Sequence, residues 1–262
     1  VPLFPFFLIN LILGLTQGLT EFLPISSSGH LVIGKHLLGL SSPGAIIEII
    51  LHFGTFFSII LYYRKYLLEL LLDAFSKNSG ESRKIIGLIL ISIIPAGVIG
   101  ILFDDYIEKL FTNLYLVGIN LIVTGVILFS TRFTHNKTKE SSLTITKVII
   151  IGIAQAIAIL PGISRSGITI STALFLGINE KEAARFSFLI ALPVLFGASI
   201  LKIKDAIAFS EDISTLNIFT GFMFSLITGY ICLSILANIL SKKKLWLFSF
   251  YCMIIGFLIF FL

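Results

Sequence analysis

The sequence predicts an all-α polytopic membrane protein of the inner-membrane type, on the evidence of its composition and the grouping of its apolar residues. Of 262 residues, 56% are hydrophobic and 13% are charged, and the mean hydropathy is +1.05. A soluble domain usually carries about a quarter charged residues. The apolar residues form long runs instead of the alternating pattern of strands, which favours spanning helices over an outer-membrane barrel.

Six of the apolar runs are long enough to cross a bilayer, which takes roughly 17 to 25 helical residues. They cover about 45–63, 85–103, 113–130, 185–203, 217–240 and 245–262. Four shorter apolar pieces flank two polar clusters, LPISSSGH and LPGISRSGIT; these pieces lie at about 4–22, 31–40, 147–160 and 168–178. Irregular polar backbone is tolerated at membrane depth only where protein buries it or where it lines a cavity. Each pair of short pieces is therefore predicted to form a re-entrant helical hairpin.

The basic residues predict the topology. Lys and Arg concentrate in loops 64–84, 131–147 and 241–244, whereas the loops near 104–109 and 204–212 hold more acidic than basic residues. Loops rich in Lys and Arg stay in the cytoplasm. With six spans and two hairpins that do not cross, the loops alternate without exception, both termini lie outside, and the hairpins enter from opposite sides. The net charge of +5 is therefore attributed to the basic cytoplasmic loops and not to a nucleic-acid partner.

A repeated spacing predicts two inverted structural repeats. Gln17 and Gln155 are each followed nine residues later by a related tetrapeptide, Ser26-Ser27-Ser28-Gly29 or Ser164-Arg165-Ser166-Gly167, at a constant offset of 138. We expect one membrane domain over 1–262, with internal repeats at about 1–130 and 143–262. In such architectures, ligand sites form near the midplane, where the N-termini of broken helices converge.

The first polar cluster holds the candidate reactive groups. Gln17 and Glu21 are spaced to share one face of a helix, and the Glu21 carboxylate could accept a proton or hold a divalent cation. Ser26 and Ser27 precede a new helix, where hydroxyls and free backbone N–H groups form an anion cradle. His30 can shuttle a proton near neutral pH or attack phosphorus itself.

The second cluster holds the groups that bind a phosphate. Arg165 offers a rigid fork of donors suited to bidentate phosphate contact, and Ser164, Ser166 and Thr169 add hydroxyls at another helix start. Helix capping alone is the competing interpretation of each serine. An arginine and a histidine in two related polar turns are hard to explain by capping, and polar groups inside a membrane are expensive. The functional interpretation is therefore preferred.

At these two motifs the chain resembles a known family. QGLTEFLPISSSGH is similar to the first signature of the bacitracin-resistance family of undecaprenyl-pyrophosphate phosphatases, and PGISRSGIT matches the second. The resemblance covers nearly the whole chain, because that family also has six spans and two re-entrant hairpins in inverted repeats. By motif position it implies the site residues Glu21, Ser27, His30, Ser164, Arg165, Ser166 and Thr169.

The resemblance also implies an activity and its setting. The family removes the terminal phosphate of undecaprenyl pyrophosphate and leaves undecaprenyl phosphate, which recycles the cell-wall lipid carrier and gives bacitracin resistance. The implied site opens toward the outer face of the bacterial inner membrane, and the implied cofactor is a divalent cation, Mg²⁺ or Ca²⁺. The family takes Glu or Gln at position 17; Gln17 carries no charge, so Glu21 is the candidate cation ligand.

Residues and resemblance together suggest one mechanism with its nucleophile left open. Arg165 and the helix N-termini would hold the pyrophosphate while His30, Ser27 or an activated water attacks the terminal phosphorus, and Glu21 would act as base or cation ligand. Inverted repeats and broken helices are also transporter architecture, so a transporter or lipid flippase is the alternative, ahead of a structural scaffold. The expected partners are the polyprenyl pyrophosphate lipid and the bilayer, with a homodimer left open.

Overall fold

The computed structural model describes residues 4–40, 45–76, 80–134, 142–208 and 214–262, and within these ranges its regular structure is entirely helical. Its α-helices are α1 (Phe6–Phe22), α2 (Ser27–Leu37), α3 (Ala45–Ala74), α4 (Gly80–Leu102), α5 (Asp104–Leu110), α6 (Leu114–Ser130), α7 (Ile145–Ile157), α8 (Arg165–Phe175), α9 (Glu180–Ala208), α10 (Thr215–Ser241) and α11 (Phe248–Leu258). Short 3₁₀ helices follow α6 (η1, Thr131–Thr134) and flank α11 (η3, Leu245–Leu247; η4, Ile259–Phe261). The expectation of an all-α chain is confirmed.

Five helical stretches in the described residues are long and apolar enough to cross a membrane, where the sequence predicted six. They are Ile47–Ala74, Gly80–Leu102, Leu114–Thr134, Glu180–Lys202 and Thr215–Ser241. The sixth predicted run, 245–262, forms a shorter apolar stretch, Leu245–Phe261, in which 3₁₀ turns flank the α-helix at both ends. Helix α3 also continues well past the predicted end at residue 63, because Arg, Lys, Leu and Glu beyond the apolar run all favour helix.

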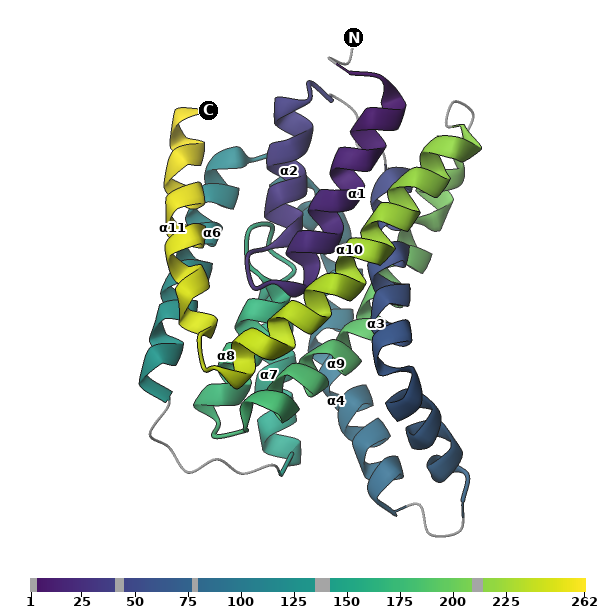
Figure 1. Ribbon diagram of the computed structural model, residues 1–262, viewed down its shortest axis with the longest axis vertical. Helices are drawn as coiled ribbons and strands as arrows, with labels where there is room; N and C mark the ends of the chain where they lie inside the picture. The colour runs from purple at the N-terminus through teal and green to yellow at the C-terminus, as the bar shows by residue number, and fades with distance from the viewer. Residues whose placement is uncertain (1–3, 41–44, 77–79, 135–141, 209–213) are drawn as a thin grey trace.

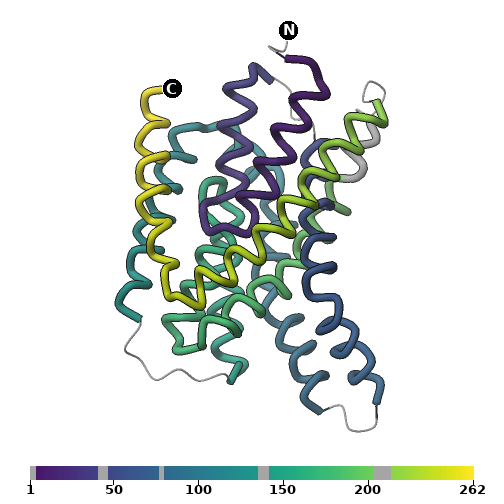
Figure 2. Tube along the Cα trace, in the orientation of Figure 1, coloured from purple at the N-terminus to yellow at the C-terminus, as the bar shows by residue number. Residues whose placement is uncertain are grey.

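The four shorter apolar pieces form two pairs of helices. Helices α1 and α2 pack together and are joined by a turn at residues 23–26, while α7 and α8 are joined by residues 158–164. Figures 1 and 2 show the first pair descending from the end of the molecule that carries the start of α1 and the end of α11, and the second pair rising from the opposite end. The two turns therefore lie near the middle of the molecule.

The two halves of the chain share more than the motif spacing. Helix α8 begins 138 residues after α2 begins and ends 138 residues after α2 ends. Helix α1 of the first half packs along α10 of the second half, and α7 of the second half packs along α4 of the first half. In the first half the pair is followed by α3, α4, the short α5 and α6, and in the second half by α9, α10 and the shorter α11.

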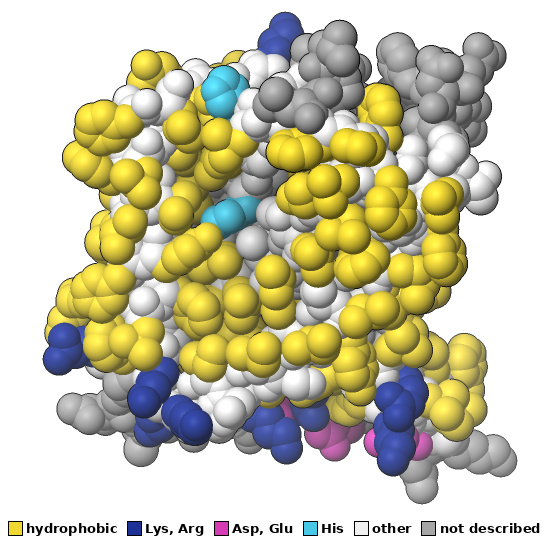
Figure 3. Space-filling view, turned by 45° about the horizontal axis from the view of Figure 1, so that its top comes forward, with side chains coloured by type: hydrophobic (Ala, Val, Ile, Leu, Met, Phe, Trp, Pro, Cys, Tyr) yellow, Lys and Arg dark blue, Asp and Glu magenta, His cyan; other side chains and the backbone are white. Residues whose placement is uncertain are grey.

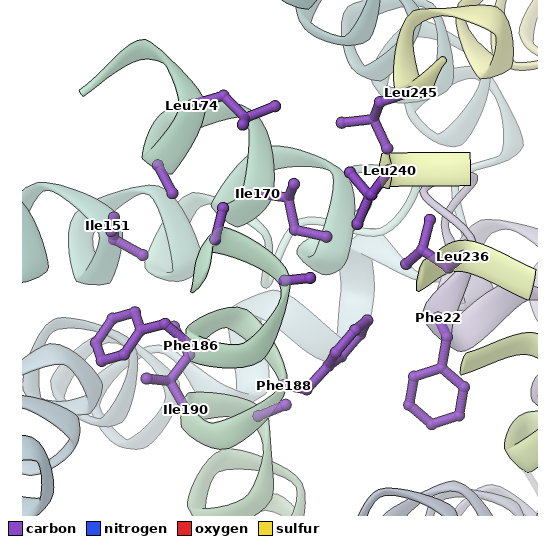
Figure 4. Close-up of a cluster of buried hydrophobic side chains, with 14 of the residues drawn as sticks. Phe22, Ile151, Ile170, Leu174, Phe186, Phe188, Ile190, Leu236, Leu240 and Leu245 are labelled. Carbon is purple, nitrogen blue, oxygen red and sulfur yellow. The ribbon is translucent and has the colours of Figure 1, made fainter. Parts of the chain in front are cut away.

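The largest apolar core lies where α1, α8, α9 and α10 meet (Figure 4). Phe22 from α1 packs edge-to-face on Phe188 from α9, with ring centroids 5.5 Å apart, and Ile170 and Leu236 complete this layer. Large apolar side chains also cover much of the outside (Figure 3). Soluble monomers rarely expose contiguous apolar surfaces of this extent. The chain is a multi-pass membrane protein.

Candidate active site

The candidate active site lies where the two turns meet. The backbone N–H of Gly162, in the second turn, donates to Ser28 Oγ across 3.4 Å. A Cβ built on Gly29 would lie 3.2 Å from the Cα of Gly162, a tight contact, and a Cβ built on Gly162 would lie 2.5 Å from the carbonyl oxygen of Val117, which is too close. Gly162 also has φ +94°, in the left-handed region that favours glycine. The glycines of both motifs are therefore needed to bring the turns together.

Helix α6 holds the second turn in position. Asn120 Nδ2 donates to the carbonyl of Pro161 at 2.7 Å, and Thr124 Oγ1 donates to the carbonyl of Gly162 at 3.0 Å. The hydroxyl of Thr124 also accepts from the backbone N–H of Ser164 at 3.1 Å. Buried main-chain groups of an irregular turn must be paired, and these two side chains supply the partners.

Each turn ends in a serine that caps the following helix. Ser26 Oγ accepts from the N–H of Gly29 at 3.2 Å, and Ser164 Oγ accepts from the N–H of Gly167 at 3.1 Å. The capping that was the competing interpretation of the serines is therefore present at Ser26 and Ser164, and α2 and α8 both begin at the junction of the turns. Ser26 has φ 70°, a conformation that typically costs about 1–3 kcal/mol in a residue other than glycine and that clusters at functional sites.

Glu21 is the centre of the polar network. Its Oε2 accepts from Gln17 Nε2 at 3.0 Å and from Ser27 Oγ at 2.5 Å, while its Oε1 forms an ion pair with Arg165. The two side chains of the ion pair are 5% and 14% exposed. Charges this deep require a partner, and here the partner is on the other turn. Gln17 also reaches Thr55 Oγ1 on α3 at 3.4 Å.

Two polar atoms at this network are buried without a partner among the described residues. They are Nη1 of Arg165 and Oε1 of Gln17. A buried donor or acceptor that lacks a partner costs about 1–3 kcal/mol. The free Nη1 donor and the helix N-termini suit an anion with several oxygens, and phosphate has that chemistry.

His30 lies at the start of α2 with both ring nitrogens bonded. Nδ1 pairs with the carbonyl oxygen of Ser26 at 2.8 Å, and Nε2 pairs with the hydroxyl of Tyr251 on α11 at 2.8 Å. The two rings are stacked, with centroids 5.6 Å apart and planes 10° apart. Figure 3 shows a histidine side chain at a hollow in the middle of a mostly apolar face.

The remaining predicted residues have mainly local partners. Ser166 Oγ lies 3.4 Å from Ser164 Oγ and 3.4 Å from the carbonyl of Leu23 in the first turn. Thr169 is fully buried, donates to the carbonyl of Arg165 at 2.7 Å, and lies 2.6 Å from Ser187 Oγ on α9. Thr169 therefore braces α8 against α9 and makes no contact with Glu21.

The described residues hold no cluster of three or more His, Cys, Asp or Glu side chains that could bind a metal by themselves. Magnesium is often held by one or two carboxylates together with substrate phosphates and water. Glu21 and the unpartnered Oε1 of Gln17 fit that kind of oxygen site.

Sequence reasoning missed the partners that come from distant helices. Asn120 and Thr124 contact the second turn, Thr55 contacts Gln17 on α1, and Tyr251 contacts His30 on α2. Asn120 and Thr124 lie four residues apart in one apolar run, Thr55 and Tyr251 lie in two others, and none of them belongs to the two motifs. A polar residue inside a predicted span was the signal that could have found them.

These features define an all-helical membrane protein in which the region of two polar turns brings a carboxylate, a guanidinium and hydroxyls into one largely buried site, with an imidazole bonded to the backbone of the first turn. Comparison with known proteins identifies the particular family. The family profile described as bacitracin resistance protein BacA matches residues 10–258, and the chain belongs to this family. The resemblance seen in the two motifs is therefore confirmed.

Relatives of similar length carry one description. The chain is 42% identical over 249 residues to an undecaprenyl-diphosphatase of Halothermothrix orenii, covering 94% of each chain. It is 42% identical over 261 residues to undecaprenyl-diphosphatase 1 of Bacillus cereus, covering 97% of this chain and 96% of the relative. An undecaprenyl-diphosphatase of Methanobrevibacter smithii is 35% identical over 266 aligned positions, with 95% of each chain covered.

Proposed function

We propose that this chain hydrolyses undecaprenyl diphosphate to undecaprenyl phosphate and inorganic phosphate, and so recycles the cell-wall lipid carrier and confers bacitracin resistance. The observation that carries the proposal is the buried network in which Glu21 binds Ser27 and Arg165 at once. The relatives described as undecaprenyl-diphosphatases align with this chain over nearly their whole length and support the same activity. They do not favour the transporter or flippase alternative.

The diphosphate would enter at the junction of the two turns. Arg165 would bind its oxygens through the free Nη1, and the N-termini of α2 and α8 would add backbone donors. Phosphoryl transfer depends mostly on such positioning and charge neutralisation. Arg165 would keep its ion pair with Glu21 through Nη2 while Nη1 binds the anion.

Ser27 is the nucleophile that the geometry favours among the three alternatives. Its hydroxyl already donates to Glu21 Oε2 at 2.5 Å, the arrangement of a nucleophile beside its base. Ser27 Oγ would form a bond to the terminal phosphorus as the bond to the bridging oxygen breaks, and its proton would pass to Glu21. Undecaprenyl phosphate would leave, and water would then release inorganic phosphate from Ser27, with His30 available for proton transfer.

A divalent cation, Mg²⁺ or Ca²⁺, would be held by Glu21 and the Oε1 of Gln17 together with substrate oxygens. Such a cation would neutralise the charge of the diphosphate. The unpartnered amide oxygen of Gln17 supports this assignment.

We further propose that the chain has six crossings and two re-entrant hairpins in inverted repeats, at about 1–130 and 143–262, in the bacterial inner membrane. The equal offset of α2 and α8 supports the repeat. The opposite directions of the two helix pairs in Figure 1 support opposite entry. The site would open to the outer face, and Leu245–Phe261 would form the sixth crossing.

The proposed activity is tested by phosphate release. Purified protein in detergent, given undecaprenyl diphosphate and Mg²⁺ or Ca²⁺, should liberate inorganic phosphate, and Arg165→Ala should liberate far less. Failure of the wild-type chain to release phosphate under any cation would overturn the proposal. Movement of labelled lipid across proteoliposomes without phosphate release would instead favour the transporter alternative.

A further inference from the structure

Tyr251 is the feature of the site that neither motif contains. It lies on α11, 221 residues from His30 in sequence, and its hydroxyl bonds to the Nε2 of that histidine at 2.8 Å. Helix α11 packs mainly on α6, whereas α2 packs mainly on α1 and to a smaller extent on α6. The contact between Tyr251 and His30 is thus a specific polar link between two helices that have few other contacts.

The partners of His30 define how its ring is used. The carbonyl of Ser26 can only accept a hydrogen bond, so Nδ1 of His30 carries a hydrogen. In the neutral imidazole Nε2 is then an acceptor, and the Tyr251 hydroxyl donates to it. Because Nδ1 is bonded to the backbone, Nε2 is the nitrogen that can take up or release a proton, and Tyr251 is bonded to Nε2.

A phenol can hold this nitrogen in both of its charge states. When Nε2 takes up a proton it becomes a donor, and the oxygen of Tyr251 can turn from donor to acceptor without either ring moving. The stacking of the two rings, with planes 10° apart, fixes their mutual orientation as well. Phenylalanine would keep the stacking but could not form the bond in either state.

We propose that Tyr251 is the positioning residue for His30, and that it holds the imidazole in one orientation at the start of α2 through the proton transfers of the reaction. This inference rests on the proposed function. Tyr251 acts here through His30 and not by binding phosphate. Its loss should therefore lower kcat and leave KM nearly unchanged.

The chain offers a matched control. Tyr230 on α10 is 40% exposed, against 41% for Tyr251, and its ring contacts Tyr62 instead of a histidine. Tyr251→Phe should lower kcat about 3- to 10-fold, the factor that one hydrogen bond typically contributes. Tyr230→Phe should retain wild-type kcat and KM.

A chemical measurement separates positioning from general stability. Diethylpyrocarbonate modifies the unbonded, unprotonated imidazole nitrogen, and peptide mass spectrometry can compare His30 with the exposed His36 on the same helix. Tyr251→Phe should raise the modification rate of His30 about 3- to 10-fold relative to His36, and Tyr230→Phe should not. In a His30→Gln background, Tyr251→Phe should have no further effect on kcat.

Three results would overturn the inference: wild-type kcat in Tyr251→Phe, a rise in KM alone, or a lower kcat with unchanged modification of His30. Tyr251→Leu, which also removes the stacked ring, should lose more activity than Tyr251→Phe if both contacts matter. If the wild-type chain releases no phosphate, the proposed function fails, whereas the modification rates still test the link between Tyr251 and His30.

Discussion

Among the described residues, Glu21 at the end of α1 is the carboxylate of the network around the two turns, and three side chains bond to it. Gln17 and Ser27 bind one oxygen, and Arg165 binds the other. The carboxylate therefore orients the hydroxyl of Ser27 and also neutralises the positive charge of the buried guanidinium. A substitution that removes the charge should affect both.

Glu21→Gln should lower phosphate release by a factor on the order of 10² or more, because the amide cannot take up the proton of Ser27 and has no negative charge with which to hold a cation. It should also lower thermal stability, since Arg165 loses its counter-charge in a site where both side chains are nearly buried. Initial rates at saturating cation and thermal unfolding in detergent measure the two effects. Activity close to that of the wild type would show that Glu21 only caps the network.

Arg165→Lys separates a phosphate clamp from a simple positive charge. Arginine can bind Glu21 through Nη2 while Nη1 remains free for phosphate, whereas a lysine ammonium is a single point charge on a flexible stem. We expect a loss of roughly 30- to 150-fold, equivalent to about 2–3 kcal/mol of transition-state stabilisation. Ser164→Ala and Ser166→Ala should cost less, because the backbone donors of the turn persist.

The measurement is initial-rate kinetics on variants with matched thermal stability. If Arg165→Lys retained the wild-type kcat and KM, Arg165 would be a structural partner of Glu21 and not a phosphate ligand.

At the scale of elements, the short helices are placed by close approach of backbones. A Cβ on Gly152 of α7 would lie 2.3 Å from the carbonyl oxygen of Ser92 on α4. Small residues allow such contacts between helices in membranes, where lipid removes most of the hydrophobic drive for association. Because α7 leads directly into the second turn, the packing of α7 against α4 also positions Arg165.

Gly152→Ala should therefore destabilise the protein, by the 1–3 kcal/mol that is roughly typical of overpacking. Gly97→Ala, on α4, is the matched control, because nothing lies within 4 Å of a Cβ built there, and alanine favours helix over glycine. Thermal unfolding in detergent, followed by the fluorescence of the single tryptophan, should show a lower Tm for the first variant only. Equal Tm values would mean that the α4 and α7 contact is looser than described.

At the scale of the whole molecule, the distribution of charge agrees with the direction of the chain. Figure 1 shows the start of α1 and the end of α11 at the same end of the molecule. In Figure 3, most of the visible Lys and Arg side chains lie along the opposite edge. Basic residues favour the cytoplasm, so the chain ends should face outside.

Cysteine labelling tests this orientation. In a background without Cys232 and Cys252, a probe that cannot cross the inner membrane should modify Asp105→Cys in cells with a permeable outer membrane, and should not modify Lys243→Cys. The opposite result would reverse the proposed topology. The sequence also predicts that Asp212 faces outside and that Lys77 and Lys139 face the cytoplasm; these three residues lie outside the described residues.

The sequence by itself determined the features that neighbouring residues encode. Apolar runs predict where helices form, and a serine of each motif caps the helix that follows, so α2 and α8 begin within the two motifs, a few residues before the apolar pieces expected at about 31 and 168. The two motifs also identified the family. The spacing of apolar residues and helix capping depend on residues within a few turns of helix. A single sequence is therefore enough to predict them.

Tertiary structure alone decided which groups meet. Arg165 reaches Glu21 across 144 residues, Thr124 holds the second turn from α6, and Tyr251 reaches His30 from the last helix. It also left the run at 245–262 as a shorter helical stretch with 3₁₀ turns at its ends. These contacts depend on how long helices pack against each other, and an isolated Thr or Tyr in an apolar run has no local pattern that names its partner.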